Sequence, residues 1–150
     1  MTNTLTPEEF RMPLGVRIIV AYPGVGKSKL TENNMSFIDL DRPDLKFNMA
    51  EYMRLIDQSL AIPGTTVLLP SWDVLREQLR NAGLPYVLFW PSRDLKFDYN
   101  KRYVNRGSPK GLVDVLWWKW DEFHDSCEQD PTPYKVEMKQ SQAYLSDYFL

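Results

Sequence analysis

A glycine-rich turn followed by a lysine and a serine is the feature of this sequence that most clearly suggests chemistry. The residues from Ala21 to Ser28 read AYPGVGKS and follow an apolar run that begins at Val16. This spacing fits the phosphate-loop pattern G-x-x-x-x-G-K-[ST], with alanine at the first glycine position. Glycines let backbone N–H groups turn toward phosphate oxygens, the lysine adds a positive charge, and the serine hydroxyl suits Mg²⁺. We therefore expect ATP to bind at Pro23, Gly24, Val25, Gly26, Lys27, Ser28 and Lys29.

Two carboxylates, Asp39 and Asp41, stand at the end of a second apolar segment that begins at Ser36. Side chains alternate along a strand, so both carboxylates lie on one face. They would orient Mg²⁺, accept a proton from an attacking oxygen or hold a substrate hydroxyl. The alternative is that Asp41 caps the turn before Arg42-Pro43 and Asp39 only ends the strand. P-loop enzymes usually carry a metal-binding acid on another strand, but the third apolar segment has none before Asp73. We therefore expect Ser28 and Asp39 to hold the metal, and Asp39 and Asp41 to be catalytic candidates.

Residues 93–110 form a strongly basic segment. Its charged side chains are Arg93, Lys96, Lys101, Arg102, Arg106 and Lys110 against Asp94 and Asp98. Six positive charges less two negative ones leave +4, in a chain whose net charge is −2. We expect a basic helical lid at about 93–110, in which Arg102 and Arg106 share one helix face and close over the transferring phosphate. The alternative is a solvated surface helix with an ion pair between Asp98 and Arg102.

Strand-like apolar runs alternate with helix-like segments along the whole chain. The expected strands are residues 16–22, 36–41, 65–69, 86–90 and 134–138. The expected helices are residues 27–33, 47–62, 72–82, 94–105, 111–127 and 142–149. Such alternation is typical of a parallel sheet covered by helices on both faces, with ligands at the carboxyl ends of the strands. We therefore predict one α/β domain over residues 1–150, with a three-layer α/β/α P-loop NTPase fold and a mostly parallel sheet of about five strands.

Composition excludes several other classes of protein. The chain has 150 residues, of which 43% are hydrophobic and 25% charged, so it is neither disordered nor collagen-like. A net charge of −2 gives no reason to expect nucleic-acid binding. No apolar run approaches the ~18 residues of a membrane span, and the polar start from Met1 to Arg11 resembles no targeting signal. With Cys127 as the one cysteine, we expect no intrachain disulfide and a cytoplasmic location.

Several conspicuous side chains are expected to be structural. Trp117, Trp118 and Trp120 fit packing in the core and between helices better than a platform for stacking bases. His124 is expected to be a surface or packing residue, and the Cys127 thiol belongs to no motif.

Taken together, these motifs resemble the small phage-encoded P-loop nucleotide kinases, which are similar to adenylate kinase and other nucleoside monophosphate kinases. The residues that carry the resemblance are Ala21–Ser28, Asp39, Asp41, Leu69-Pro70-Ser71, Lys96, Arg102-Tyr103, Arg106-Gly107 and the ending Tyr144-Leu145-Ser146-Asp147. The resemblance covers most of the chain, from about residue 16 onward.

The resemblance implies ATP as the phosphoryl donor, Mg²⁺ as its metal and a nucleotide as the acceptor. It implies that Lys27 and Ser28 hold ATP·Mg²⁺ and that Arg102 and Arg106 belong to the lid. It also implies that the segment from Phe47 to Leu60 packs over the acceptor base.

Three functions remain open from the sequence. The leading expectation is an ATP-dependent (deoxy)nucleoside monophosphate kinase. An alternative is a kinase that acts on a hydroxyl of a nucleoside, a modified base in DNA or a metabolite, with Asp39 or Asp41 as the base. A third is a phage nucleotide-binding protein that does not catalyse and acts by contacting a host partner.

Overall fold

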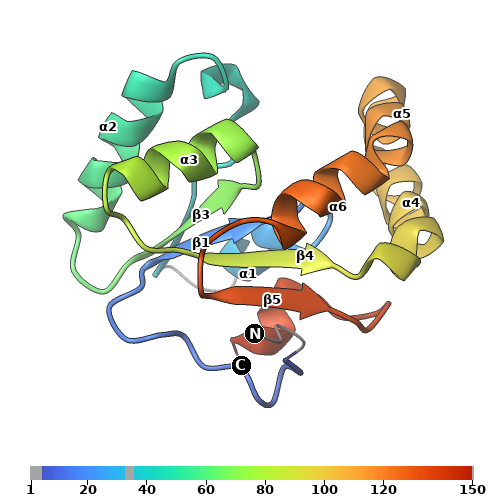
Figure 1. Cartoon of the computed structure of the whole chain (residues 1–150), viewed down its shortest axis with the longest axis horizontal. Coiled ribbons are helices and arrows are strands. Elements are labelled where there is room, and N and C mark those ends of the chain that lie inside the picture. Colours follow the sequence, from blue (N-terminus) through green and yellow to red (C-terminus); the bar gives the residue numbers. More distant parts are fainter. Residues whose placement is uncertain (1–4, 33–35, 150) are drawn as a thin grey trace.

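The computed structural model describes residues 5–32 and 36–149, and a five-stranded parallel sheet forms its centre (Figure 1). The strands are β1 (Ile18–Ala21), β2 (Phe37–Asp39), β3 (Thr66–Pro70), β4 (Val87–Pro91) and β5 (Lys135–Met138). Their order across the sheet is β2-β3-β1-β4-β5, and all neighbouring pairs run parallel. The predicted α/β class and the five-stranded sheet are confirmed.

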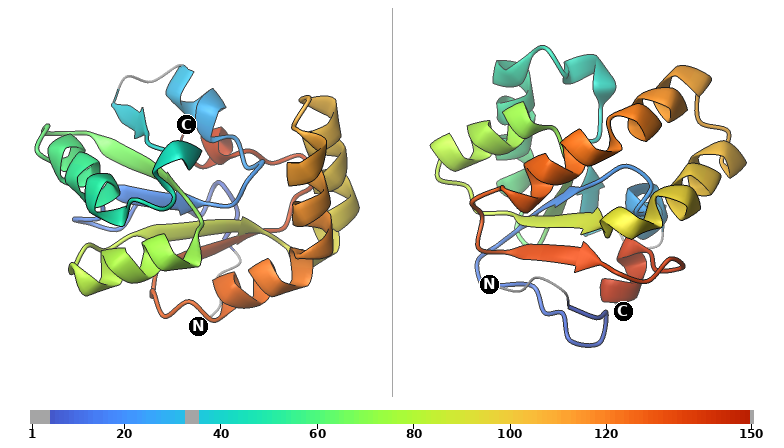
Figure 2. Two further views of the ribbon diagram at one scale, coloured as in Figure 1. Left: turned by 90° about the horizontal axis from the view of Figure 1, so that it is seen from above. Right: turned by 45° about the vertical axis from the view of Figure 1, so that its right-hand side comes forward.

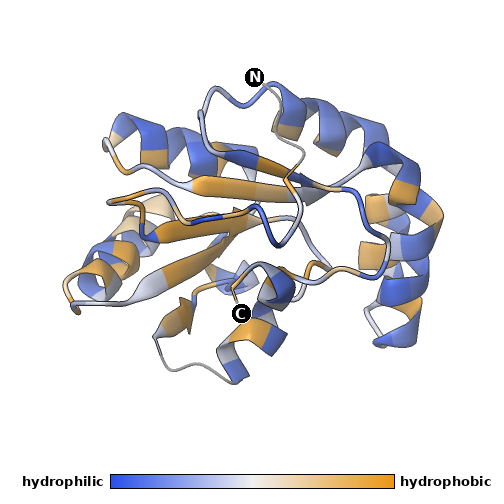
Figure 3. Ribbon diagram, turned by 90° about the horizontal axis from the view of Figure 1, so that it is seen from below, coloured by the Kyte–Doolittle hydropathy of each residue, from blue (hydrophilic) through white to orange (hydrophobic). Residues whose placement is uncertain are grey.

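Burial explains why β1 occupies the middle of the sheet. All four of its residues are buried, and Ile19 pairs with Leu68 of β3 on one side and Val87 of β4 on the other. A strand covered on both faces must be apolar at every position, which is the pattern of its IIVA sequence. The edge strands β2 and β5 instead contain half-buried residues. The apolar interiors of the central strands and the hydrophilic outer sides of the helices are visible in Figure 3.

Helices cover both faces of the sheet. The α-helices are α1 (Lys27–Glu32), α2 (Met49–Leu60), α3 (Asp73–Asn81), α4 (Lys96–Asn105), α5 (Lys110–Trp118) and α6 (Trp120–Glu128). The 3₁₀ helices are η1 (Pro43–Leu45), η2 (Arg93–Leu95) and η3 (Leu145–Tyr148). In Figure 1, α2, α3 and α6 lie above the sheet, whereas η3 lies below it and is in contact with α1. This arrangement is compatible with the three-layer fold expected from the alternation.

The helices α4 and α5 stand apart from these layers. They form an antiparallel pair beyond the carboxyl ends of the strands, as both views in Figure 2 show. The glycine turn, residues 22–26, follows β1 at the same end of the sheet, so the topology brings α4 to the predicted phosphate site. Over the described residues, no helix has the length and apolar character needed to cross a membrane.

Three expected elements differ from those observed. The helix predicted over residues 111–127 is broken at Lys119 into α5 and α6, and the change of direction lets the buried Trp120 donate from Nε1 to Arg93 O at 2.9 Å. The closing helix predicted over residues 142–149 is the short η3. Phe47 was expected on the apolar face of the second helix, but it precedes the N-cap Asn48 and is 94% exposed. The predicted end of the first helix at Asn33 lies outside the described residues.

A buried ionic network stabilises the face formed by α3 and α6. Asp130 has no exposed side-chain surface, and its carboxylate accepts from Arg76 at 2.8 Å and from Arg80 at 3.0 Å. The Tyr86 hydroxyl donates to the same carboxylate at 2.8 Å. Burial raises the pKa of Asp130, but the bonds from Arg76, Thr132 and Tyr86 outweigh it and hold the pKa below its ordinary value. The network therefore keeps a charged carboxylate inside the protein, far from the glycine turn.

Candidate functional site

The glycine turn has the backbone shape that its two glycines predict. Gly24 has a φ of 89° and Gly26 a φ of 101°, values that residues with side chains rarely adopt. A β-carbon on Gly24 would lie 2.6 Å from Cε1 of Tyr103, and one on Gly26 would lie 3.0 Å from Cδ1 of Tyr144. Aromatic rings from distant parts of the chain thus pack directly against the turn, which leaves no room for a β-carbon at Gly24 and little at Gly26.

Three consecutive carbonyl oxygens of the glycine turn accept hydrogen bonds from distant parts of the chain. The pairs, with the donor first, are Tyr103 Oη to Pro23 O at 2.8 Å, Arg102 Nη1 to Gly24 O at 2.8 Å, and Leu145 N to Val25 O at 2.7 Å. Two of the donors belong to α4 and the third begins η3. The turn is thus held from its outer side by α4 and by the segment that follows β5.

Lys27, the first residue of α1, lies over the end of β1. Its side chain is only 7% exposed, and Nζ lies 3.3 Å from Oδ2 of Asp41. The same Nζ donates to Ala21 O at 3.0 Å. Burial lowers the pKa of Lys27, and the neighbouring Asp41 carboxylate opposes that shift. The predicted phosphate-binding lysine is therefore held beside the glycine turn by a carboxylate and a carbonyl oxygen.

Asp39 and Asp41 border the site at the end of β2. Asp39 Oδ1 accepts the backbone N–H of Asp41 at 2.9 Å, so Asp39 caps the turn, whereas the turn-capping alternative gave that role to Asp41. Asp41 points its own carboxylate to Lys27 and is 32% exposed. The structure thus brings both carboxylates to the carboxyl edge of the sheet and places Asp41 directly against the lysine.

The metal-binding expectation rests on Ser28 and Asp39. Ser28 is exposed on the first turn of α1, next to the equally exposed Lys29. Within residues 5–32 and 36–149, no three or more His, Cys, Asp and Glu side chains form a group able to hold a metal. Mg²⁺ in nucleotide sites is commonly bound by one or two protein oxygens together with phosphates and water. A hydroxyl and a carboxylate fit that mode of binding and do not fit an all-protein metal site.

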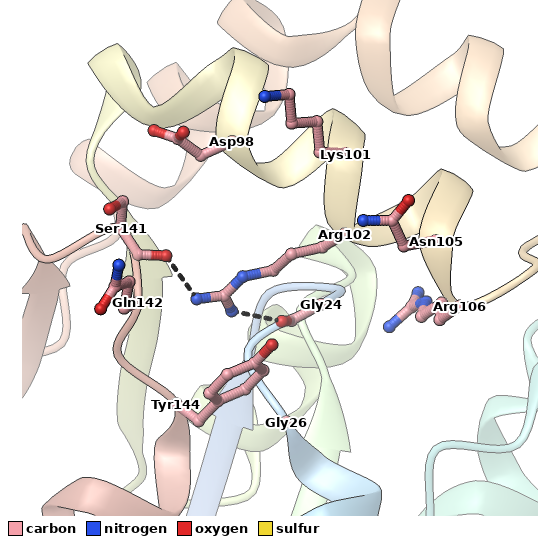
Figure 4. A pocket seen from close by; sticks show the side chains of 10 residues that line it. All are labelled: Gly24, Gly26, Asp98, Lys101, Arg102, Asn105, Arg106, Ser141, Gln142 and Tyr144. Carbon is pink, nitrogen blue, oxygen red and sulfur yellow. Dashed lines mark hydrogen bonds between the residues drawn. The ribbon is translucent and has the colours of Figure 1, made fainter.

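An open cavity of about 670 Å³ lies against the glycine turn (Figure 4). Its lining comes from the turn, from one face of α4 and from the segment after β5: Gly24, Gly26, Asp98, Lys101, Arg102, Asn105, Arg106, Ser141, Gln142 and Tyr144. Three of these side chains are cationic and one is anionic. The cavity therefore suits a negatively charged ligand that extends away from the turn.

Arg102 is the most constrained side chain of the cavity. Besides its bond to the glycine turn, it donates from Nη2 to Ser141 O and to Ala143 O, both at 2.7 Å. Its guanidinium carbon lies 4.3 Å from the ring centroid of Tyr99 and 4.1 Å from that of Tyr144. Figure 4 shows the guanidinium reaching across the cavity floor to both backbone partners that are drawn. The side chain thus joins α4 to the glycine turn and to the segment after β5.

Arg106 lies one helical turn further along α4 and is exposed. It donates from Nε to Ser108 Oγ at 2.7 Å, and its guanidinium carbon lies 5.2 Å from the ring centroid of Tyr103. Burial is the main cause of the lowered pKa of Lys27, and the positive charge of Arg106 lowers it further. The two cations therefore act on the same region of the site.

Other expected candidates lie elsewhere. Arg93 pairs with three carboxylates of α6, and Lys96 Nζ lies 4.0 Å from the ring centroid of Trp117. Trp120 is buried, as expected, but the packing role expected for Trp118 is wrong, since α5 presents that ring to solvent with 81% of its surface exposed.

The sequence analysis predicted no role for the tyrosines of the site, although Tyr103 and Tyr144 belong to the segments that carry the family resemblance. Tyr99 and Tyr103 are buried on α4 and pack beside the glycine turn, and Tyr144 covers Arg102 from the other side. A signal existed for the first two, because Arg102, Tyr103 and Arg106 follow Tyr99 by three, four and seven residues, which places all four on one helix face.

No protein-family model matches this chain, and no curated protein matches it either. Its function is therefore argued from the site alone.

Proposed function

We propose that this protein is a phosphotransferase of the P-loop NTPase fold that transfers the terminal phosphoryl group of ATP to a hydroxyl acceptor. The observation that carries the proposal is the placement of Lys27. Lys27 is buried and is the first residue of α1, directly after β1 and a turn with two positive-φ glycines. Its ammonium is held by Asp41 at the edge of the sheet. Phosphate-binding loops combine these elements because they concentrate N–H groups and positive charge at one point.

In this proposal the donor nucleotide lies along the glycine turn. The phosphates of ATP meet the backbone from Pro23 to Lys29, and the Lys27 ammonium exchanges Asp41 for a phosphate oxygen. The nucleoside half extends into the cavity that α4 and the segment after β5 line beside the turn. With ATP as its donor, the protein is expected to act in the cytoplasm.

Magnesium belongs to the same site, where Ser28 and Asp39 are the residues that would hold it. Bound there, Mg²⁺ neutralises negative charge on the phosphates of the donor. Lys27 and Arg106 add positive charge of their own toward the transferring phosphate.

The carboxylates favour a hydroxyl as the acceptor. An attacking hydroxyl must lose its proton, and Asp41, one-third exposed and next to Lys27, has a carboxylate placed to accept it. The acceptor oxygen then forms a bond to the γ-phosphorus while the bond from that phosphorus to the bridging oxygen of ADP breaks. A monophosphate acceptor needs no base, and two carboxylates would repel its negative charge.

A (deoxy)nucleoside monophosphate kinase is the second candidate. The exposed Arg106 guanidinium favours it, because an acceptor phosphate needs a cation on its side of the site. A nucleotide-binding protein that does not catalyse is the third candidate. The carboxyl end of β3 favours it, since the first acid there, Asp73, is exposed and accepts the N–H of its own neighbour Val74 at 2.8 Å.

An acceptor panel with labelled ATP distinguishes the three candidates. Nucleosides, hydroxyl-bearing DNA bases, small polyols and all common nucleoside monophosphates are supplied with MgATP to the wild-type protein and to Asp41→Asn. The exposed Asp57→Asn on α2 is the matched control. A hydroxyl kinase labels a hydroxyl compound and loses at least ~10²-fold in rate in Asp41→Asn, in line with the usual contribution of a general base. Labelling of a monophosphate that persists in Asp41→Asn supports the second candidate, and ATP binding without any transfer supports the third.

A further inference from the structure

Arg102 makes contacts that would not be needed if its role were to bind the transferring phosphate. Three of the five N–H donors of its guanidinium are engaged by backbone oxygens of the glycine turn and of residues 141 and 143. Its plane is enclosed between the rings of Tyr99 and Tyr144. Moving this group toward a phosphate would break all three hydrogen bonds together.

The orientation of the glycine turn depends on those bonds. In a planar trans peptide, the C=O group points away from the N–H of the next residue. The C=O groups of residues 23, 24 and 25 point to donors on α4 and at the start of η3. The N–H groups of residues 24, 25 and 26 therefore point inward, and that of Val25 does so toward Tyr22 O at 3.4 Å. Successive inward N–H groups form the concave surface that receives phosphate oxygens.

We propose that Arg102 is a positioning residue which, together with Tyr103, sets the peptide orientations of the glycine turn and so shapes the subsite for the diphosphate of the donor nucleotide. The inference rests on the proposed function, because it concerns the same donor site. Arg102 on α4 and Arg106 at its C-cap then have different roles. Arg102 acts through the glycine turn on the phosphates that ATP and ADP share, and Arg106 is left to meet the phosphate that is transferred.

Titrations with MgADP and MgATP test this division, and they need no knowledge of the acceptor. Calorimetry compares the wild-type protein with Arg102→Ala, Arg102→Lys and Tyr103→Phe. The control is Arg54→Ala, which removes an exposed arginine on α2 that pairs with Glu51 one helical turn before it. We expect Arg102→Ala to weaken both nucleotides by the same factor, ~10-fold or more, which is the scale of one or two charge-assisted hydrogen bonds. Arg102→Lys should restore little of the lost nucleotide affinity, because a compact ammonium lacks the planar guanidinium geometry that reaches several acceptors at once.

Tyr103→Phe keeps the ring and removes one donor to the turn, so it should weaken both nucleotides by a smaller common factor. It also keeps the test decisive if Arg102→Ala fails to fold. Amide hydrogen exchange should quicken at residues 23–27 and stay unchanged in the central strands, which separates a loosened turn from general destabilisation.

Two results would overturn the inference. In the first, Arg102→Ala weakens MgATP but leaves MgADP unchanged, which means that the side chain meets the terminal phosphate. In the second, neither Arg102→Ala nor Tyr103→Phe changes the affinity for either nucleotide. Wild-type protein that binds neither nucleotide refutes the proposed function itself and removes the basis for this inference.

Discussion

Replacing Gly24 by alanine should reveal how closely α4 packs against the glycine turn. Gly24 has a φ of 89°, and the added β-carbon would lie 2.6 Å from Cε1 of Tyr103. The ring cannot swing into solvent, because Tyr103 is only 1% exposed and its hydroxyl donates to Pro23 O at 2.8 Å. Either the turn or the helix must therefore move.

The magnitude follows from two contributions. A left-handed backbone costs a residue with a β-carbon about 1–2 kcal/mol, and the stiffer unfolded chain returns about 0.4–1 kcal/mol. Forcing an extra carbon into a filled site costs about 1–3 kcal/mol more. Gly24→Ala should thus lower the free energy of unfolding by about 1–5 kcal/mol. Gly64→Ala is the matched control, because Gly64 has a φ of 77° with nothing within 4 Å of its β-carbon, and it should cost about 1 kcal/mol or less.

Urea unfolding followed by tryptophan fluorescence gives both values. A third comparison uses Tyr103→Ala as the background, in which the 2.6 Å contact is gone and the 3.3 Å contact with Cδ2 of Tyr99 remains, so Gly24→Ala should cost less there than in the wild-type protein. If Gly24→Ala and Gly64→Ala destabilise the wild-type protein equally, α4 does not pack on the glycine turn as described.

Three further predictions concern separate parts of the molecule. Lys27→Ala should reduce the rate of phosphoryl transfer by ~10³-fold or more, as kinetics would show. The free energy of unfolding in urea should change by about 1 kcal/mol or less, because Asp41, which loses its partner, is one-third exposed and can be hydrated. Asp130→Asn should cost about 3 kcal/mol at neutral pH by leaving Arg76 without its buried partner. Since the folded-state pKa of Asp130 is lowered, the stability it contributes is present above the unfolded pKa of ~3.9 and is lost as the pH falls through the folded value. In unfolding experiments the difference between the two proteins should therefore start to shrink below about pH 4 and disappear only below the folded pKa. Trp118→Ala should change stability by about 0.5 kcal/mol or less and Trp120→Ala should cost about 3–5 kcal/mol, as thermal or urea unfolding would show.

Much of the fold could be predicted from the sequence because the central strands are buried on both faces. Such strands are apolar at every position, and β1, β3 and β4 stand out for that reason. The break between α5 and α6 was not readable. The apolar pattern runs on past Lys119, and the break depends on a tertiary contact, the bond from the Trp120 indole to the backbone of η2. Phe47 was misplaced because its hydrophobicity fits a helical period that the N-cap Asn48 cuts short.

The candidate site was readable only where its residues are neighbours in sequence. The glycines and Lys27 form a local motif, so their arrangement could be expected. The pairing of Lys27 with Asp41 could not, because it depends on β2 and β1 ending at the same edge with β3 between them. The three backbone acceptors of Arg102 were equally invisible, since a carbonyl group is present at every residue and carries no sequence signal.

The outer bonds of the glycine turn also set an order of events during synthesis of the chain. Arg102 and Tyr103 follow their acceptors by 78 and 80 residues, and Leu145 comes later still. Contacts between residues so far apart form late, after local helices and the nearer strand pairs. In a growing chain, Gly24 and Gly26 are therefore synthesised long before the donors that fix the orientation of the peptide groups in the turn. The turn is completed only when residues 141–145 have left the ribosome. Under this order, the proposed phosphate site is not complete on the nascent chain until synthesis has passed the last strand.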